Sequence, residues 1–213
     1  RRFLDDLLTS RWPRMAGLRA AYDRVLKHRS TLLKSLAGRG PRGMEAESTL
    51  DVWDEKLAHL GAEIVEARLA TLADLVPLLQ AAYADIAPTR NQAGASYQSS
   101  SLPSVSPEQD VADDPSMEEK PHLVGSGVSF SRVELAGLLL ERMRRRRGEE
   151  IARGLSLVGP HRDEVALTLS GLPARGYASH GESWSLALAL RLASFAVLRA
   201  DGVEPVLVLD DVF

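Results

Sequence analysis

Hydrophobic residues in the first 87 positions recur at the spacing of amphipathic helices. One apolar stripe follows Pro13, a break rich in Gly and Pro spans residues 38–43, and a second stripe continues to about residue 87. The stripes are Leu18, Tyr22, Val25, Leu32 and Leu36, then Trp53, Leu57, Leu60, Ile64, Leu72, Leu75 and Leu79. Spacings of three, four and seven place such residues on one helix face. The pattern predicts an antiparallel helical hairpin, with Ser10 as the first N-cap and a kink at Pro77.

The second half of the chain combines helical and strand-like patterns. Helices are predicted over residues 131–153 and 182–200, where the second is rich in Ala and Leu. Strands are predicted over residues 155–158, 165–169 and 205–209. The last of these is apolar at every position, which is typical of a parallel strand covered on both faces.

Residues 88–130 differ from both halves in composition. They contain nine Ser and five Pro, which favours a surface loop or linker. The alternative is that two short strands, over 95–98 and 124–128, pair at the edge of a sheet. We therefore expect three parts: a helical-hairpin arm over 1–87, a Ser/Pro-rich loop or edge-strand segment over 88–130, and an α/β part over 131–213.

Composition narrows the classes of protein. The 213 residues include 26 Lys and Arg against 29 Asp and Glu, a net charge of −3, which argues against nucleic-acid binding over the whole surface. The absence of Cys excludes disulfides, Cys-bound metals and thiol catalysis. No window approaches the roughly 18 uncharged apolar residues of a membrane span, so we expect a cytoplasmic protein. The chain lacks an initial Met and stops after an apolar run, so we expect a piece of a longer protein.

Two carboxylates, Asp210 and Asp211, follow the last predicted strand. The carboxyl ends of parallel strands form the edge at which open α/β sheets bind ligands. Carboxylate oxygens suit Mg²⁺, which takes its remaining ligands from water and phosphate. The pair therefore predicts a Mg²⁺–nucleotide site, with an ordinary solvated turn as the alternative.

The sequence Ser179-His180-Gly181-Glu182 opens the predicted helix before that strand. Ser at the N-cap and Glu three residues later form a capping box. The same geometry suits a phosphate, because a helix start offers free N–H groups and Gly181 allows close approach. If the Glu182 carboxylate turns toward the helix start, it competes with that phosphate, so cap and ligand are alternatives.

Basic residues form two further candidate sites. His161 and Arg162 follow a Gly-Pro turn and are candidates for contacts with DNA or a second protomer; the alternative is a local hydrogen-bonded turn. Arg144 and Arg145 belong to an arginine run over residues 142–147. Such a run binds phosphates in a salt-dependent manner or forms a solvated helix face beside nearby Glu residues.

The order of these elements resembles the signature helix and Walker B strand of ABC-type ATPases. Within that class the chain resembles the RecF family of bacterial recombination proteins, relatives of the SMC proteins, in an actinobacterial-style version. The residues that carry this resemblance are Arg1-Arg2-Phe3-Leu4-Asp5, Lys27-His28-Arg29, Trp53-Asp54, Leu157-Val158-Gly159-Pro160-His161-Arg162-Asp163 and Ser179-His180-Gly181-Glu182-Ser183-Trp184. It implies an α/β fold, the C-terminal half of an ABC-type (P-loop) ATPase head with an inserted antiparallel helical-hairpin arm.

The resemblance also implies roles for the acidic and signature residues. Ser179 and Gly181 would contact the γ-phosphate of ATP held by a second protomer, together with Glu182 of the same motif. Asp210 would bind Mg²⁺, and Asp211 stands where many relatives place the glutamate that polarises the attacking water. Glu182 replaces the usual Gln, and Asp211 is one methylene shorter than Glu. Both departures predict slow ATP hydrolysis.

As function, the resemblance implies an ATP-driven homodimer that clamps DNA at single-strand/double-strand junctions. It would help to load the recombinase together with RecO and RecR. The 213 residues lack a Gly-x-x-x-x-Gly-Lys-Ser/Thr loop, so we expect them to be inactive alone although the intact protein hydrolyses ATP. The alternatives are a nucleotide-binding subunit of a transporter and a non-enzymatic helical interaction protein.

Overall fold

The structure, a computed structural model, describes residues 1–37, 44–87, 92–99, 101–102, 122–124, 130–208 and 210. Its elements along the chain are α1 (Arg2–Arg11), α2 (Arg14–Leu36), α3 (Met44–Ile86), β1 (Ala93–Ser99), β2 (His122–Val124), α4 (Arg132–Arg153), β3 (Glu164–Leu169), β4 (Leu172–Pro173), α5 (Ala174–Tyr177) and α6 (His180–Ala200). Helices therefore dominate both ends, and the short strands lie between them in sequence.

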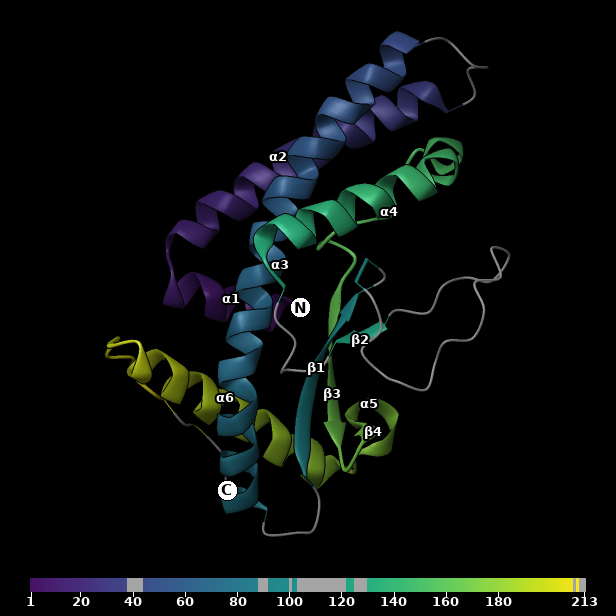
Figure 1. Cartoon of the computed structure of the whole chain (residues 1–213). Helices are drawn as coiled ribbons and strands as arrows, with labels where there is room; N and C mark the ends of the chain where they lie inside the picture. Colours follow the sequence, from purple (N-terminus) through teal and green to yellow (C-terminus); the bar gives the residue numbers. More distant parts are fainter. Residues whose placement is uncertain are drawn as a thin grey trace.

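Helices α2 and α3 lie side by side and antiparallel, which confirms the predicted hairpin (Figure 1). The 43 residues of α3 continue through Pro77 and give it a length of about 65 Å. The start of the hairpin differs from the prediction. Ser10 lies inside α1, where its hydroxyl donates to the carbonyl of Asp6, so it is not the N-cap of α2.

The buried face of α2 is rotated from the predicted apolar stripe. Its buried residues are Met15, Tyr22, Arg29 and Leu33, whereas Leu32 is only half-buried. The cause is Arg29, which is fully buried because carboxylates of other helices pair with it. The predicted stripe counted apolar residues only, so it left Arg29 out and placed the buried face on neighbouring positions.

The four strands form one antiparallel sheet in the order β2-β1-β3-β4. In β1 the side chains at alternate positions from Ala93 to Ser99 are buried, as expected for a strand with one face against α3. Tyr97 pairs with Val165 on one side and with Val124 on the other. The alternative interpretation of residues 88–130 is thus confirmed for 95–98 and for Val124; residues 125–128 lie outside the described part.

One other predicted strand is wrong. Residues 155–158 form no strand, because side chains take the backbone groups: Glu150 accepts from the N–H of Leu157, and Arg162 donates to the carbonyl of Ser156. Residues 203–208 have no paired strand beside them in the described part of the chain, with Val206 88% and Val208 80% exposed, and Leu209 lies outside the described residues. The parallel strand over 205–209 therefore stays a prediction, since a parallel ladder needs a neighbouring strand.

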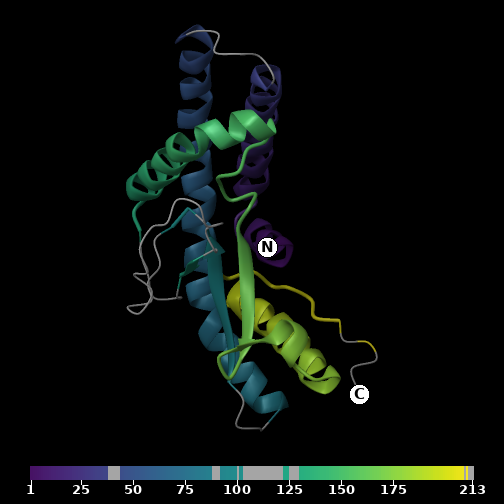
Figure 2. The same cartoon turned by 90° about the vertical axis from the view of Figure 1, so that its right-hand side faces the viewer.

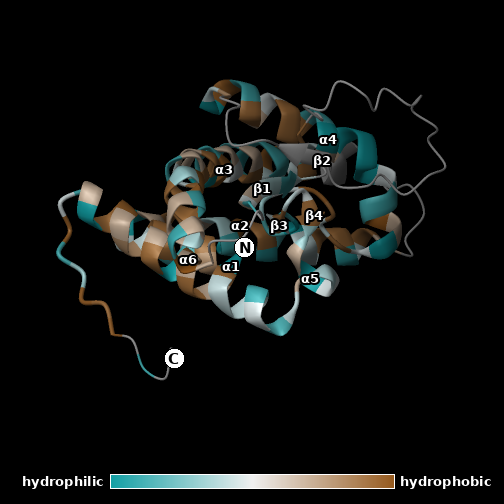
Figure 3. Ribbon diagram, turned by 90° about the horizontal axis from the view of Figure 1, so that it is seen from below, coloured by the Kyte–Doolittle hydropathy of each residue, from teal (hydrophilic) through white to brown (hydrophobic). Residues whose placement is uncertain are grey.

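Helix α6 crosses the lower part of α3 and packs against it (Figures 1 and 2). Its buried residues are Leu186, Ala189, Ala193 and Val197, at the spacing of one helix face. Contrary to the expectation from the sequence, Ser48–Ile86 and His180–Ala200 are long and apolar enough, by length and composition alone, to cross a membrane. Core helices of soluble proteins pass the same test, and both of these helices contribute residues to the hydrophobic core. The view from below shows apolar residues along α6, including its side away from α3 (Figure 3).

One hydrophobic core joins the two halves of the chain. It contains residues of α1 to α3, such as Leu7 and Leu75, together with Leu139 of α4, Val158 and Leu186. Both helices of the hairpin extend away from the sheet at the end where α2 finishes and α3 begins (Figure 2). The division at residues 87 and 130 remains a prediction.

Candidate functional site

The first turn of α6 brings together Ser179, Gly181 and Glu182. Ser179 is the N-cap, and its hydroxyl accepts a hydrogen bond from the backbone N–H of Glu182 (3.3 Å). The Glu182 carboxylate accepts in return from the backbone N–H of Ser179 (2.8 Å). This reciprocal arrangement is a capping box, which satisfies two N–H groups that a helix start leaves without a partner. The capping interpretation of the motif is therefore confirmed in this chain.

The same turn has the properties of an anion site. Ser179 and Gly181 are exposed at the positive end of the dipole of a 21-residue helix. A Cβ atom placed on Gly181 would meet nothing within 4 Å, so no contact with the described residues requires glycine here. A phosphate can approach from outside the chain, but the Glu182 carboxylate already lies at the helix start.

Asp210 lies exposed in the extended segment after α6, and Asp211 lies outside the described residues. A lone carboxylate suits a Mg²⁺ ion that takes its other ligands from water and nucleotide phosphates. It does not suit a metal site built from protein alone, and the described residues hold no group of three or more His, Asp or Glu placed for one. The described segment thus offers one oxygen ligand of the type that Mg²⁺ prefers.

His161, which is half-buried, and Arg162, which is exposed, lie in a turn closed by a hydrogen bond from the N–H of Arg162 to the carbonyl of Gly159. The Tyr22 hydroxyl donates to Nδ1 of His161 (2.7 Å), and Nε2 donates to the carbonyl of Ser156 (3.2 Å). Arg162 donates to the same carbonyl through Nε (3.1 Å) and Nη2 (2.9 Å). Gly159 has a φ of +127°, and a Cβ there would lie 2.4 Å from the Tyr22 hydroxyl oxygen. These partners favour the local hydrogen-bonded turn; a contact with DNA or a second protomer stays a prediction.

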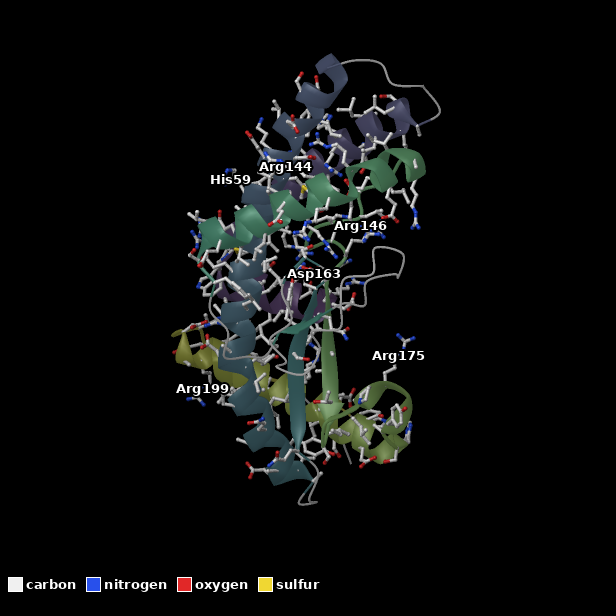
Figure 4. The ribbon with its side chains drawn as sticks, turned by 45° about the vertical axis from the view of Figure 1, so that its right-hand side comes forward. His59, Arg144, Arg146, Asp163, Arg175 and Arg199 are labelled. Carbon is white, nitrogen blue, oxygen red and sulfur yellow. The ribbon has the colours of Figure 1, made fainter. Side chains whose placement is uncertain are left out.

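Burial shifts two pKa values in this turn in opposite directions. It lowers the pKa of His161 to about 4, and the Arg162 guanidinium adds to that shift, so the imidazole is neutral at pH 7. It raises the pKa of Asp163 to about 6, although hydrogen bonds from Tyr97 and Ser99 oppose the shift. Figure 4 shows Asp163 inside the molecule, where the sheet approaches α4, whereas Arg175 and Arg199 project outward.

The arginine run on α4 is largely neutralised by carboxylates. Arg145 pairs with Glu141 (2.7 Å) and Arg146 with Glu149 (2.6 Å). Arg144 is exposed and has no ion pair among the described residues. The solvated-face interpretation is therefore favoured for Arg145, and Arg144 is the better candidate for a phosphate contact.

A buried charge network, not predicted from the sequence, joins the arm helices to α4. Arg29 donates to Asp54 (2.5 Å), Glu150 (2.5 Å) and Ser156 (2.9 Å), and both carboxylates are fully buried. Arg147 of α4 also pairs with Asp54 (2.7 Å). Because each buried charge has partners, the network holds α2, α3 and α4 in one arrangement.

A second network joins α1, α3 and β1. Arg68 makes two hydrogen bonds to the Asp5 carboxylate (2.8 and 3.1 Å) and donates to the Tyr97 hydroxyl (3.0 Å) and the carbonyl of Pro160 (2.8 Å). The Tyr97 hydroxyl donates in turn to Asp163 (2.8 Å). The sequence contained one signal for both networks, since Arg29 and Arg68 lie among apolar residues at helical spacing.

Comparisons with known proteins agree with the resemblance noted in the sequence. No family model matches the chain. Proteins named "DNA replication and repair protein RecF" match all of it: those of Cutibacterium acnes at 50% identity, Streptomyces avermitilis at 49% and Frankia alni at 51%. The chain spans about half the length of these relatives, 52%, 51% and 52%.

Solved structures show the same fold at lower identity. A structure of the recombination mediator protein RecF with ATP, in the RecFOR pathway, superimposes with a TM-score of 0.80 at 23% identity; it covers the whole chain and 49% of that protein. The form described as RecF-ATPrS gives 0.78 at 24% identity, over 99% of this chain and 49% of the other. The predicted fold class is thereby confirmed. The chain matches the C-terminal half of RecF, and it belongs to the RecF family.

Proposed function

We propose that the chain supplies the signature turn and a magnesium ligand of an ATP-dependent DNA-binding protein of recombinational repair and replication. Ser179 and Gly181 bind the γ-phosphate of ATP held by a second protomer, and Glu182 belongs to the same turn. Asp210 binds Mg²⁺, and Asp211 polarises the attacking water. When bound, the nucleotide supplies the phosphoryl group, and the residues of this chain orient it.

One observation carries this proposal: the open start of α6 in a chain that matches RecF along its whole length. Helix starts bind phosphate through free backbone N–H groups and the helix dipole, and glycine gives the ligand access to them. A side chain at position 181 would fit, because no described atom lies within 4 Å of a Cβ placed there. Packing within the described residues therefore does not require glycine at this position. A ligand or a second protomer gives a reason for glycine there.

Slow hydrolysis is part of the proposal. The Asp211 carboxylate has a shorter reach than a glutamate, and Glu182 places a negative charge at the turn that binds the phosphate. Both features disfavour the transition state, in which negative charge spreads over the transferred phosphoryl group. The intact protein then acts as a switch, with ATP closing the dimer and hydrolysis slowly opening it.

The ATP-bound dimer clamps DNA near single-strand/double-strand junctions and helps to load the recombinase. RecO and RecR are the proposed partners, in agreement with the RecFOR pathway to which the similar solved structures are assigned. The proposed location is the bacterial cytoplasm, where such repair takes place.

The test uses the full-length protein and Mg²⁺-dependent ATP turnover. We expect Asp210→Asn to abolish turnover, because the amide is a poorer magnesium ligand than the carboxylate. Glu204→Gln removes a carboxylate from the same exposed segment and should leave turnover unchanged. Ser179→Ala should weaken ATP-dependent dimerisation, whereas Ser131→Ala, in the matching capping box of α4, should not. Wild-type turnover in Asp210→Asn would refute the magnesium assignment.

A further inference from the structure

The hydroxyl of Tyr83, near the end of α3, is buried and has no hydrogen-bond partner among the described residues. The residue is 1% exposed, and among the described residues no atom accepts from or donates to its oxygen. Leaving a buried hydroxyl unpaired costs free energy, so such a group calls for an explanation. The ring belongs to the core that also contains Leu186 of α6.

Tyr83 lies on the helix that packs against α6, in the same hydrophobic core as Leu186, one turn after Glu182. Burial and the charge of Glu182 both raise the pKa of the tyrosine, so its hydroxyl keeps its proton and remains a donor at neutral pH. A donor that has no partner among the described residues thus lies within electrostatic range of the carboxylate that caps α6.

The Glu182 carboxylate has to leave the helix start when a phosphate binds there. In the structure the Glu182 carboxylate accepts a hydrogen bond from the backbone N–H of Ser179 (2.8 Å). A γ-phosphate at the helix start would compete for the N–H groups there, and it is negatively charged like the carboxylate. Two anions at one helix start repel each other, most strongly in a site from which water is excluded. The displaced carboxylate then needs another donor.

We propose that Tyr83 is a positioning residue of the signature site, whose hydroxyl receives the Glu182 carboxylate when the γ-phosphate of a second protomer displaces it from the start of α6. This inference rests on the proposed function. Because Tyr83 belongs to the same 43-residue helix as the arm, the exchange connects phosphate binding to the position of α3. The N–H of Ser179 and the hydroxyl of Tyr83 are then the two positions between which the Glu182 carboxylate switches.

The test is a double-mutant cycle in the full-length protein, read as the ATP concentration that gives half-maximal dimerisation. Tyr83→Phe should raise that concentration roughly tenfold, because a hydrogen bond to a charged group is lost. In a Glu182→Gln background the neutral amide can leave without a charged partner, so Tyr83→Phe should change dimerisation by less than about twofold. Thermal unfolding without nucleotide should show Tyr83→Phe to be at least as stable as wild type, since the unpaired hydroxyl is removed.

Two controls separate the switch from general damage. Tyr177→Phe removes a hydroxyl from a tyrosine that is 71% exposed and should change nothing. Glu134→Gln alters the matching capping box of α4 and should not modify the effect of Tyr83→Phe. The inference is overturned if Tyr83→Phe changes dimerisation equally in the wild-type and the Glu182→Gln proteins. It is also overturned if Tyr83→Phe changes dimerisation in neither protein. Normal ATP-dependent dimerisation of Ser179→Ala would instead refute the proposed phosphate site. The two proposals can therefore fail separately.

Discussion

Tyr22 and His161 are 139 residues apart in sequence, yet the tyrosine hydroxyl lies 2.7 Å from Nδ1 of the imidazole. The contact joins α2 to the turn that leads into β3 and sets the tautomer, since Nδ1 accepts the hydrogen bond from Tyr22 and the Nε2–H donates to the carbonyl of Ser156. The turn that resembles the RecF family is thus held by the first arm helix, and it carries two titrating groups whose pKa values shift in opposite directions on folding.

The first prediction concerns Asp163→Asn in the full-length protein. His161 has its pKa lowered from 6.5 to about 4 in the folded state, so the unfolded state binds the proton more tightly and stability is lost as pH falls through this window. Asp163 has its pKa raised from 3.8 to about 6, so its effect has the opposite sign: stability is lost as pH rises through that window. In the wild type the two effects largely cancel between pH 4 and 6.

Asp163→Asn removes the titrating carboxyl group and leaves the effect of His161 on stability uncompensated. Relative to wild type, the variant should lose thermal stability as pH falls from 6.5 to 4.5, by up to about 3 kcal/mol for a shift of two pH units. His161→Gln should show the opposite slope over the same range. The measurement is the melting temperature of each variant minus that of wild type at several pH values. Parallel curves for the three proteins would contradict the assigned shifts.

The second prediction contrasts two glycines. Gly159→Ala should destabilise the protein by more than about 1 kcal/mol, because alanine is strained at a φ of +127° and its Cβ would clash with the Tyr22 hydroxyl. Gly181→Ala should leave the melting temperature unchanged, since its Cβ meets only open space. It should nevertheless weaken ATP-dependent dimerisation. If Gly181→Ala dimerises normally, close approach of a phosphate at this position is excluded.

The third prediction concerns the buried network of Arg29. Arg29→Met leaves the fully buried carboxylates of Asp54 and Glu150 without this partner and should cost about 3–5 kcal/mol of stability. Arg24→Met, at an exposed position of the same helix, should change stability by less than about 0.5 kcal/mol. Chemical unfolding of both variants measures the difference. Equal stabilities would mean that the network does not hold the arm to α4.

The fourth prediction separates Arg144 and Arg145, the exposed members of the arginine run on α4. If this face contacts DNA, Arg144→Ala should reduce the salt dependence of DNA binding by about one unit in the log–log slope, since one phosphate contact is lost. Arg145→Ala should leave the slope unchanged, because Glu141 already pairs with that side chain (2.7 Å). DNA affinity of the full-length protein at several salt concentrations provides the test. Unchanged slopes for both variants would show that α4 does not bind phosphate.

Helical periodicity predicted most of the architecture. The hairpin, the helix over residues 132–153 and α6 follow from apolar residues at three- and four-residue spacing, a pattern that depends only on local geometry. The capping boxes at Ser131 and Ser179 could also be read from the sequence, because N-cap and partner are three residues apart. Short-range hydrogen bonding is enough to determine these features.

Strands were harder to predict because pairing partners lie far apart in the chain. The apolar run over 205–209 predicts a buried strand, and no neighbouring strand lies beside residues 203–208 among the described residues. Because the chain spans about half the length of its RecF relatives, this strand stays a prediction. Residues 155–158 failed for a related reason, since distant side chains such as Arg162 and Glu150 occupy their backbone groups. Hydrophobicity alone does not say which partner a segment will find.

Local sequence alone therefore determined where the helices run, how α6 begins and which short motifs resemble the RecF family. The tertiary structure decided which charges are buried together, as in Arg29 with Glu150 and Arg68 with Asp5, and which hydroxyls meet a titrating group. The physical reason is range. A helix is stabilised by contacts within one turn, whereas the desolvation of a charge and the shift of a pKa depend on every group that folding brings near it.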